Sequence, residues 1–369
     1  MKKVLVVGAG FSGAVVAREL AEFGCKVRVI DEREHVGGNC HTQRDTDTDI
    51  MVHTYGPHIF NTSIARVWEY VNKYGEWMPY VNRVKAAISS GVYSLPINLH
   101  TINQFFKTNL NPTEAQKYIA SIASKKYPSP ANFEEQALSM IGEELYEAFF
   151  KEYTKKQWGC LPTALSASIL KRLPVRFDYN DNYYNSIWQA IPKEGYTKIV
   201  ENILHHENVA VQLNSAYEQD TNSQYDLVIY TGPIDRYFDH CFGKLGYRTV
   251  YWEKHYGRGD IQGTAVINYT SSAPLFTRVH EHKHFAPWET HDSSVVFTEF
   301  SKETSSGDIP YYPKRLPHDM EILAKYQQEA AKQDKVRFVG RLATYRYLNM
   351  DAIISEALNF SDSAKLMLS

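Results

Sequence analysis

The chain has 369 residues, of which 43% are hydrophobic and 22% are charged, a balance typical of a folded globular protein with more than one domain. Its formal net charge of −2 gives no basic footprint for nucleic acid, and no apolar run is long enough to span a membrane. These properties favour a protein that acts on small molecules, with no nucleic-acid partner and no membrane insertion.

The N-terminal third begins with a strand–helix–strand pattern. An apolar strand over residues 3–7 leads through a glycine-rich turn into an amphipathic helix that ends near Phe23, and residues 26–30 form a second strand. A helix over residues 62–74 and a hairpin over residues 84–95, with its turn at Ser90-Gly91, are expected next.

The remaining elements form a helical block, a β-rich block and a final α/β segment. The predicted helices of the first block cover residues 101–108, 112–126, 132–138 and 142–154. Strands return over residues 207–230 and 245–300, and the chain closes with a helix over 320–332, a strand over 337–340 and a helix over 351–358.

The turn after the first strand has the spacing Gly8-x-Gly10-x-x-Gly13, in the strand–helix context that a dinucleotide-binding site requires. Gly8 permits the tight turn, Gly10 admits a pyrophosphate to the backbone, and Gly13 lets the helix pack on the strand. Asp31 follows the second strand, where an acid binds a ribose hydroxyl. The pattern predicts a dinucleotide cofactor; a glycine turn without a ligand is the alternative.

Two later features favour FAD over NAD. The segment Asp31-Glu32-Arg33 precedes a glycine pair, Gly37-Gly38, as in FAD-binding oxidase-type folds. Near the C-terminus a strand ending at Gly340-Arg341 precedes a helix that starts near Asp351, and the N-terminus of this helix would stabilise negative charge on a reduced flavin. Ordinary turns and helix capping are the alternatives. A second glycine fingerprint for NAD(P)H is absent, which argues against a self-contained reductase.

The order of these signals predicts a discontinuous α/β fold. A Rossmann-like FAD-binding domain is expected to comprise residues 1–80, 200–240 and 315–369. A helical domain over residues 98–170 is inserted into it, and an antiparallel β-sheet domain comprises residues 81–97, 177–199 and 241–314.

The cysteines give no sign of a disulfide framework or a metal site. Cys25, Cys40, Cys160 and Cys241 form no C-x-x-C pair and have no histidine cluster at zinc spacing. The sequence therefore predicts reduced thiols, no metal and a cytoplasmic location.

Beyond these general patterns, the chain closely resembles the bacterial UDP-galactopyranose mutases along essentially its whole length. The matching segments are residues 55–60 (YGPHIF), 153–159 (YTKKQWG), 169–177 (ILKRLPVRF), 230–235 (YTGPID), 281–285 (EHKHF), 310–313 (PYYP) and 340–343 (GRLA). The resemblance implies an isomerase that interconverts UDP-galactopyranose and UDP-galactofuranose, and that supplies furanose donors for cell-surface polysaccharide such as lipopolysaccharide or capsule. It also implies a homodimer.

The family resemblance implies a non-redox use of FAD. An external reductant reduces the flavin, its N5 attacks the anomeric carbon and expels the nucleoside diphosphate, and the sugar ring opens and recloses while bound to N5. Cations must hold the departing diphosphate, and arginine binds phosphate with two parallel hydrogen bonds. By motif match Arg172 and Arg278 take this catalytic role, with His58 near the flavin; Arg172 lies in a segment, about 165–176, that is a mobile lid in the family. A solvated surface arginine and a buried structural histidine are the alternatives.

The resemblance also assigns further contacts. The implied substrate contacts are Asn82, Phe150, Tyr153, Thr154, Trp158, Tyr183, Arg248, Tyr312 and Tyr347, together with Arg172 and Arg278. The implied cofactor contacts are Gly8, Gly10, Ser12, Gly13, Asp31, Glu32, Arg33, Gly38, Asn39, His58, Ile59, Gly232, Arg341, Tyr347 and Met350. Each aromatic could also be a core or rim side chain, and Arg248 and Arg341 could form structural ion pairs.

Two positions depart from the family pattern and leave the exact substrate open. Asn61 stands where family members commonly carry a histidine, and Glu152 replaces a small residue. A sibling mutase acting on UDP-N-acetylgalactosamine or dTDP-fucose is therefore an alternative. Two other classes are an amine-oxidase-like redox flavoenzyme, which shares the glycine fingerprint, and a non-catalytic nucleotide-binding protein.

Overall fold

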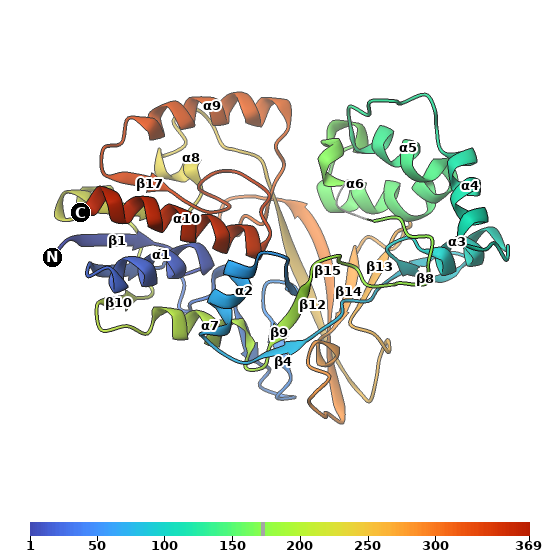
Figure 1. The fold of residues 1–369 in the computed structure, drawn as a ribbon, viewed down its shortest axis with the longest axis horizontal. Helices are drawn as coiled ribbons and strands as arrows, with labels where there is room; N and C mark the ends of the chain where they lie inside the picture. The colour runs from blue at the N-terminus through green and yellow to red at the C-terminus, as the bar shows by residue number, and fades with distance from the viewer. Residues whose placement is uncertain (171–173) are drawn as a thin grey trace.

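The structure, a computed structural model, describes residues 1–170 and 174–369. Figure 1 shows a parallel sheet with its helices at one end of the molecule, a block of helices at the other end, and a long twisted sheet between them. Both termini lie at the end that carries the parallel sheet (Figure 1).

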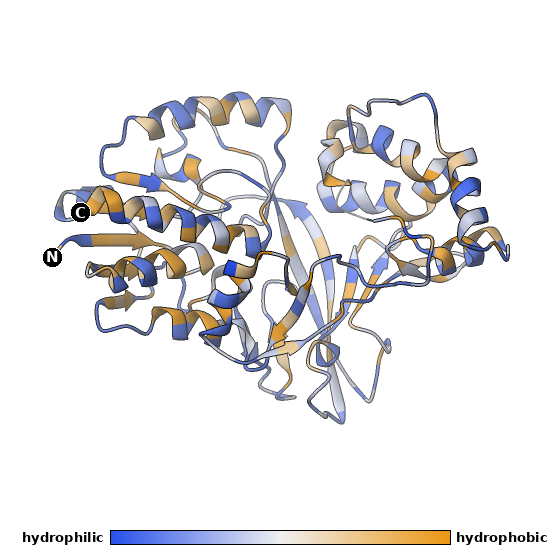
Figure 2. Ribbon diagram, viewed as in Figure 1, coloured by the Kyte–Doolittle hydropathy of each residue, from blue (hydrophilic) through white to orange (hydrophobic). Residues whose placement is uncertain are grey.

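The parallel sheet has the strand order β10-β2-β1-β11-β17. Its strands are β1 (Lys3–Val7), β2 (Lys26–Ile30), β10 (Val209–Gln212), β11 (Leu227–Tyr230) and β17 (Val336–Phe338), and every pairing is parallel. Other elements pack on both faces of the sheet, and its central strands, β1 after Lys3 and β11, are apolar, as the hydropathy colouring of β1 shows (Figure 2), whereas β2, β10 and β17 each carry polar residues. The order reverses beside β1, and open α/β sheets bind ligands at the carboxyl ends of the strands at such a point.

The helices around this sheet belong to the two ends of the chain and to its middle. Helix α1 (Phe11–Glu22) contacts α7 (Gly195–Leu204) and α10 (Met350–Leu368), while α9 (Pro317–Ala331) contacts β17 and α8 (Ile234–Tyr237). The predicted Rossmann-like fold with distant segments brought into one sheet is thereby confirmed.

The central sheet has the order β16-β12-β15-β14-β13-β7-β8. Its bounds are β7 (Val84–Ile88), β8 (Gly91–Leu95), β12 (Tyr247–Arg258), β13 (Val266–Tyr269), β14 (Arg278–Glu281), β15 (Ser293–Glu303) and β16 (Tyr312–Pro313). The expected antiparallel pairing holds except between β13 and β7, which run parallel.

The helical block consists of α3 (Leu99–Phe106), α4 (Pro112–Ile122), α5 (Phe133–Tyr146), a π-helical turn (Glu147–Lys151) and α6 (Glu152–Trp158). Asn98, Asn111 and Asn132 accept hydrogen bonds at the starts of α3, α4 and α5, as good N-cap residues do. Gly142 has φ 77° inside α5 and marks a kink where the sequence analysis placed a helix start.

Shorter elements connect the blocks. They are β3 (Thr42–Arg44), β4 (Met51–His53), β5 (Phe60–Thr62), α2 (Ala65–Asn72), β6 (Trp77–Pro79) and β9 (Trp188–Pro192), of which β5, β9 and β6 form a small sheet. Among the described helices none is long and apolar enough to cross a membrane. The four cysteines all lie in the described ranges and are free thiols.

Two helices differ clearly from the sequence-based expectation. The last helix, predicted over residues 351–358, continues to Leu368, because Ile354, Ala357, Leu358, Ser361, Ala364 and Leu368 recur every three or four positions and become buried. Helix α7 was not predicted, although its apolar residues have the same spacing.

Candidate active site

A cavity of about 1360 Å³ extends from the parallel sheet to the helical block. It is lined by the β1–α1 turn, the segments around residues 30–40 and 55–63, the π-helical turn and α6, β13 and β14, and residues 341–353. Ligand pockets commonly measure roughly 300–1,000 Å³, so this cavity is large enough for a dinucleotide and a second ligand end to end.

The dinucleotide end of the cavity is formed by two glycine loops that face each other. Gly37 N donates to Ala9 O over 2.9 Å, and a Cβ built on Gly10 would lie 3.8 Å from Gly38 Cα. Gly10 is the N-cap of α1, and no side chain caps this helix in the part of the chain that is described. The first N–H groups of α1 therefore adjoin the cavity, and such a helix start stabilises phosphate.

Gly13 has a different role, since it does not line the cavity. A Cβ at Gly13 would lie 1.9 Å from Gly8 O, so this glycine lets α1 pack against the end of β1. The predicted packing role therefore fits the geometry, and the predicted cofactor contact is indirect.

Asp31 and Arg33 follow β2 and line the cavity. Asp31 accepts hydrogen bonds from Ala9 N at 2.7 Å and from Arg33 N at 2.9 Å, which fixes its carboxylate beside the glycine turn. The Arg33 guanidinium lies 4.8 Å from the centre of the Tyr55 ring and donates to Asn39 Oδ1 over 2.9 Å. Its buried NH1 has no hydrogen-bond partner in the described chain, a pattern that suits an anionic ligand.

Arg341 is a second buried cation at the cavity. Its guanidinium lies 5.2 Å from the Tyr312 ring centre and 4.8 Å from the Tyr347 ring centre. Its Nε and NH2 have no hydrogen-bond partner among residues 1–170 and 174–369. The alternative of a structural ion pair therefore finds no support for Arg341. Glu32, by contrast, forms an ion pair: its two carboxylate oxygens accept hydrogen bonds from Arg236 NH1 and NH2 at 2.9 and 2.7 Å.

Arg278 extends from β14 and lines the cavity away from the dinucleotide end. The register places it opposite Glu299 of β15, and Glu299 accepts from Arg278 Nε at 3.0 Å and from NH2 at 2.7 and 2.8 Å. Glu299 is 1% exposed. Burial disfavours the charge on Arg278, but the attraction of Glu299 outweighs it and raises the pKa of Arg278 above its usual range. The site therefore holds a permanently charged, rigidly oriented guanidinium.

His58 lines the cavity on the loop before β5. Its Nδ1 lies 2.7 Å from Gly56 O, so Nδ1 carries the proton and Nε2 is left as an acceptor. Burial, followed by the nearby Arg341 and Arg278 charges, lowers the pKa of His58 to about 4. His58 is thus a neutral imidazole at pH 7, whose Nε2 can accept a hydrogen bond but is too weak a base to take up a proton readily.

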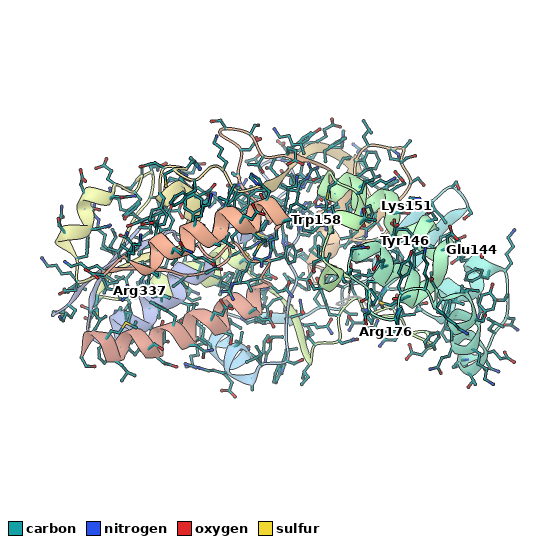
Figure 3. The ribbon with its side chains drawn as sticks, turned by 90° about the horizontal axis from the view of Figure 1, so that it is seen from above. Glu144, Tyr146, Lys151, Trp158, Arg176 and Arg337 are labelled. Carbon is teal, nitrogen blue, oxygen red and sulfur yellow. The ribbon has the colours of Figure 1, made fainter. Side chains whose placement is uncertain are left out.

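Aromatic side chains form the wall between the two ends of the cavity. Tyr312 and Tyr347 stack with ring centres 5.8 Å apart, and Trp158 lies 6.2 and 6.1 Å from them. Figure 3 places Trp158 at the side of the helical block that is nearest the rest of the protein, while Tyr146 and then Glu144 lie farther from it. Flat apolar faces of this kind bind sugar and base rings.

The structure brings most of the predicted residues together. Those that line the cavity are Gly8, Gly10, Ser12, Asp31, Glu32, Arg33, Gly38, Asn39, His58, Ile59, Phe150, Tyr153, Thr154, Trp158, Tyr183, Gly232, Arg278, Tyr312, Arg341, Tyr347 and Met350. Arg172 lies outside the described residues, as does part of the predicted lid segment.

Arg248 and Asn82 do not line the cavity. Arg248 is 4% exposed and donates to Gln157 O at 3.1 Å, to Lys156 O at 3.2 Å and to Glu303 Oε1 at 2.9 Å, so its guanidinium caps the end of α6 and forms a structural ion pair. The substrate contact expected of Arg248 is not supported by this geometry. Asn82 is buried beside the loop that carries Tyr183, because its carbonyl accepts from Tyr183 N over 2.9 Å.

Several cavity residues were not found from the sequence. Gln157 lies three positions after Thr154 on α6, and this spacing predicts that the two residues share one face of the helix. Asn268 lines the cavity because β13 pairs with β14 and sets Asn268 opposite Arg278, which no local pattern reveals. Asn61, by contrast, was singled out in the sequence as a departure from the family pattern; it lines the cavity, and its Oδ1 accepts from Ser186 Oγ over 2.9 Å. Glu152 does not line it and pairs with Lys155 at 2.5 Å.

Comparisons with known proteins agree with this arrangement. A family model described as UDP-galactopyranose mutase matches residues 148–347, and one described as NAD(P)-binding Rossmann-like domain matches residues 6–74. A Klebsiella pneumoniae protein named "Probable UDP-galactopyranose mutase" is 53% identical over 98% of this chain and 94% of its own. A dTDP-fucopyranose mutase of Escherichia coli is 50% identical over 97% of each chain.

The fold is similar to that of solved flavoenzymes. The crystal structure of a reduced UDP-galactopyranose mutase matches with a TM-score of 0.77 at 16% identity, over 100% of this chain and 96% of the other. A putrescine oxidase redesigned in its cofactor binding matches with a TM-score of 0.62 at 12% identity, over 99% of each chain. At these identities the likeness concerns the fold alone.

Proposed function

The chain belongs to the UDP-galactopyranose mutase family of flavin-dependent isomerases, and we propose that it interconverts UDP-galactopyranose and UDP-galactofuranose with reduced FAD. One observation carries the proposal: a single cavity joins the glycine cradle of a dinucleotide to Arg278, which Glu299 holds in place. A cofactor and a diphosphate-containing substrate can therefore meet inside one cavity. We propose further that the product serves as a furanose donor for cell-surface polysaccharide.

The residues present fit FAD. The uncapped start of α1 and the partnerless NH1 of Arg33, both judged on the described residues, suit its pyrophosphate. Asp31 is held where a ribose hydroxyl would bind. Reduced FAD supplies N5 as the nucleophile for the sugar's anomeric carbon, so a covalent sugar–N5 bond is expected during turnover.

The protein groups then act on the leaving diphosphate and on the sugar. Arg278 stabilises the charge that develops on the diphosphate, since its guanidinium is fixed and needs no reorganisation. We propose that Arg172 contributes a second guanidinium, on the family resemblance alone. The neutral Nε2 of His58 can accept a hydrogen bond from a sugar hydroxyl. The aromatic wall of Trp158, Tyr312 and Tyr347 excludes water from the reacting centre.

The test is turnover of UDP-galactofuranose by flavin-loaded protein, with and without dithionite, with flavin spectra recorded in parallel. We expect activity with reduced flavin, none with oxidised flavin, and no net consumption of reductant or oxygen. Cyanoborohydride added during turnover should trap a sugar on N5, detectable by mass spectrometry. Absence of turnover in the reduced protein contradicts the proposed reaction, and stoichiometric oxygen consumption indicates a redox oxidase instead.

The nucleotide sugar could differ in this chain, and two observations favour dTDP-fucose as the second candidate. One relative at 50% identity is named a dTDP-fucopyranose mutase, and Asn61 lines the cavity where the family commonly has a histidine. The ratio of kcat/KM for UDP-galactofuranose and dTDP-fucofuranose decides between them.

Asn61→Ala is expected to change this sugar preference. Loss of one neutral hydrogen bond at the sugar changes the ratio of the two kcat/KM values by about five- to tenfold, because a typical hydrogen bond contributes about 1 kcal/mol. Inhibition by free UDP should stay unchanged, since the nucleotide contacts are elsewhere. Asn72→Ala is the control, because Asn72 is exposed on α2 and its amide bonds only to Trp68 O among described residues. An unchanged ratio in Asn61→Ala contradicts a role in sugar selection.

A further inference from the structure

Lys156 is a half-buried lysine of α6 that does not line the cavity. Its Nζ donates to three backbone carbonyls, those of Tyr269 at 2.7 Å, Pro274 at 2.9 Å and Phe276 at 2.9 Å. An ammonium group has three donors, so every one of them is used. One acceptor is the last residue of β13 and the other two lie in the connection to β14; residues 269–277 together are here called the β13–β14 connection.

The ammonium of Lys156 has no carboxylate within ion-pair distance in the part of the chain that is described. Its charge is met by peptide dipoles, and burial lowers the pKa of Lys156 to about 8, against the weaker opposing effect of Glu152 on the same helix. Burying an ammonium group that is hydrogen-bonded only to carbonyls loses solvation free energy. The group therefore adds little stability, but its three hydrogen bonds fix α6 relative to the connection.

The two segments that Lys156 joins both lead into the site. On one side α6 carries Tyr153, Thr154 and Trp158, which line the cavity. On the other side the β13–β14 connection ends where Arg278 begins β14. The end of α6 has a separate attachment, since Ser301 Oγ donates to Gln157 O over 2.7 Å and Arg248 caps the same carbonyl. That attachment fixes α6 to β15 and β12 and does not involve the β13–β14 connection.

We propose that Lys156 is a positioning residue for nucleotide-sugar binding, which sets the α6 side chains at a fixed distance from Arg278. The inference rests on the proposed function, because Arg278 and the α6 aromatics are there the groups that hold the diphosphate and the nucleoside. Without Lys156 the connection loses its direct link to α6, and the ligand has to order this part of the site when it binds. Affinity then falls, whereas the chemical step of the bound substrate changes little.

The experiment compares Lys156→Met, Lys156→Arg and Lys155→Met as flavin-loaded proteins. Lys155 is the matched control, because it is the adjacent lysine on α6 and its Nζ pairs with Glu152 instead of the connection. The dissociation constant of UDP is measured by titration, and KM and kcat are measured with UDP-galactofuranose. In Lys156→Met we expect both the UDP dissociation constant and KM to rise about tenfold, as for loss of charge-assisted hydrogen bonds. Flavin content should not change and kcat should change little.

The two other variants refine the test. Lys156→Arg keeps the charge and donors and should recover part of the affinity, and Lys155→Met should match the wild type. Unchanged UDP affinity and KM in Lys156→Met overturn the proposal. If Lys156→Met fails to hold flavin, Lys156→Gln retains two N–H donors and takes its place, and failure of both variants shows a role in folding and overturns the positioning role. If the wild-type protein binds UDP but shows no turnover, the proposed reaction is contradicted. The ratio of the UDP dissociation constants of Lys156→Met and the wild type still tests the positioning role of Lys156.

Discussion

Replacing Arg278 by alanine should lower kcat/KM by on the order of 10³-fold in protein that retains its flavin. In the proposed reaction the guanidinium stabilises the charge on the departing diphosphate, and Glu299 holds it by contacts of 2.7 to 3.0 Å. Alanine leaves no cation at this position of β14. The measurement is kcat and KM with UDP-galactofuranose under dithionite, with the enzyme concentration taken from flavin absorbance.

The same change should also destabilise the fold, because Glu299 is 1% exposed and loses its partner. Removal of one member of a buried ion pair costs about 3–5 kcal/mol of unfolding free energy. Assays well below the melting temperature separate this loss from the catalytic one, and Arg278→Lys provides a second check because it keeps a positive charge near Glu299. Its activity should fall less than that of the alanine variant, since a point charge replaces only part of a bidentate contact.

Arg44 offers a matched control for Arg278. It also forms a bidentate pair with a glutamate, Glu289, at 2.7 Å for both contacts, but it is 40% exposed and does not line the cavity. Arg44→Ala should leave kcat/KM unchanged and cost at most about 1 kcal/mol of stability. Wild-type kcat/KM in flavin-loaded Arg278→Ala would remove Arg278 from the mechanism.

Replacing Gly10 by alanine should give a folded protein that purifies largely without flavin. The backbone of Gly10 has φ −80° and ψ −178°, which alanine adopts freely, and the nearest protein atom to an added Cβ lies 3.8 Å away. The methyl group would instead occupy the space between the two glycine loops where the pyrophosphate is expected. Flavin absorbance per mole of protein and circular dichroism measure the two effects.

Two other glycine-to-alanine changes complete this comparison. Gly13→Ala should prevent folding, because its Cβ would lie 1.9 Å from the Gly8 carbonyl oxygen. Gly259→Ala should keep both fold and flavin, because no atom lies within 4 Å and only its φ of +63° costs about 1 kcal/mol. Full flavin content in Gly10→Ala would contradict a pyrophosphate at the start of α1.

The dinucleotide end of the cavity could be predicted from the sequence because its signals are local. The glycine spacing, Asp31 and the strand–helix–strand pattern lie within a few tens of residues, and each element forms from its own periodicity. The substrate end was predicted from the family resemblance, because its residues come from separate segments. Tyr153, Arg278 and Tyr312 share no local pattern, and only the pairing of strands and the packing of α6 bring them to one cavity.

Arg248 shows why a residue type alone does not decide a role. An arginine in a family of nucleotide-sugar enzymes is a reasonable phosphate ligand, yet Arg248 donates to the last carbonyls of α6 and to Glu303. A helix end leaves carbonyls without partners inside the helix, and a nearby cation satisfies them. The role follows from where α6 ends relative to β12, which the sequence of either element does not state.

The sequence by itself determined the fold class, the dinucleotide cradle and the family, because these depend on patterns that short segments carry. Tertiary structure decided which cationic side chains face the cavity and which form hydrogen bonds with other parts of the protein. Arg278 lines the cavity in a fixed orientation because β14 and β15 pair in one register. Arg248 and Lys156 instead donate hydrogen bonds to backbone carbonyls of neighbouring elements. Charge is a property of the residue, but the partner that meets it is set by contacts between segments far apart in the chain.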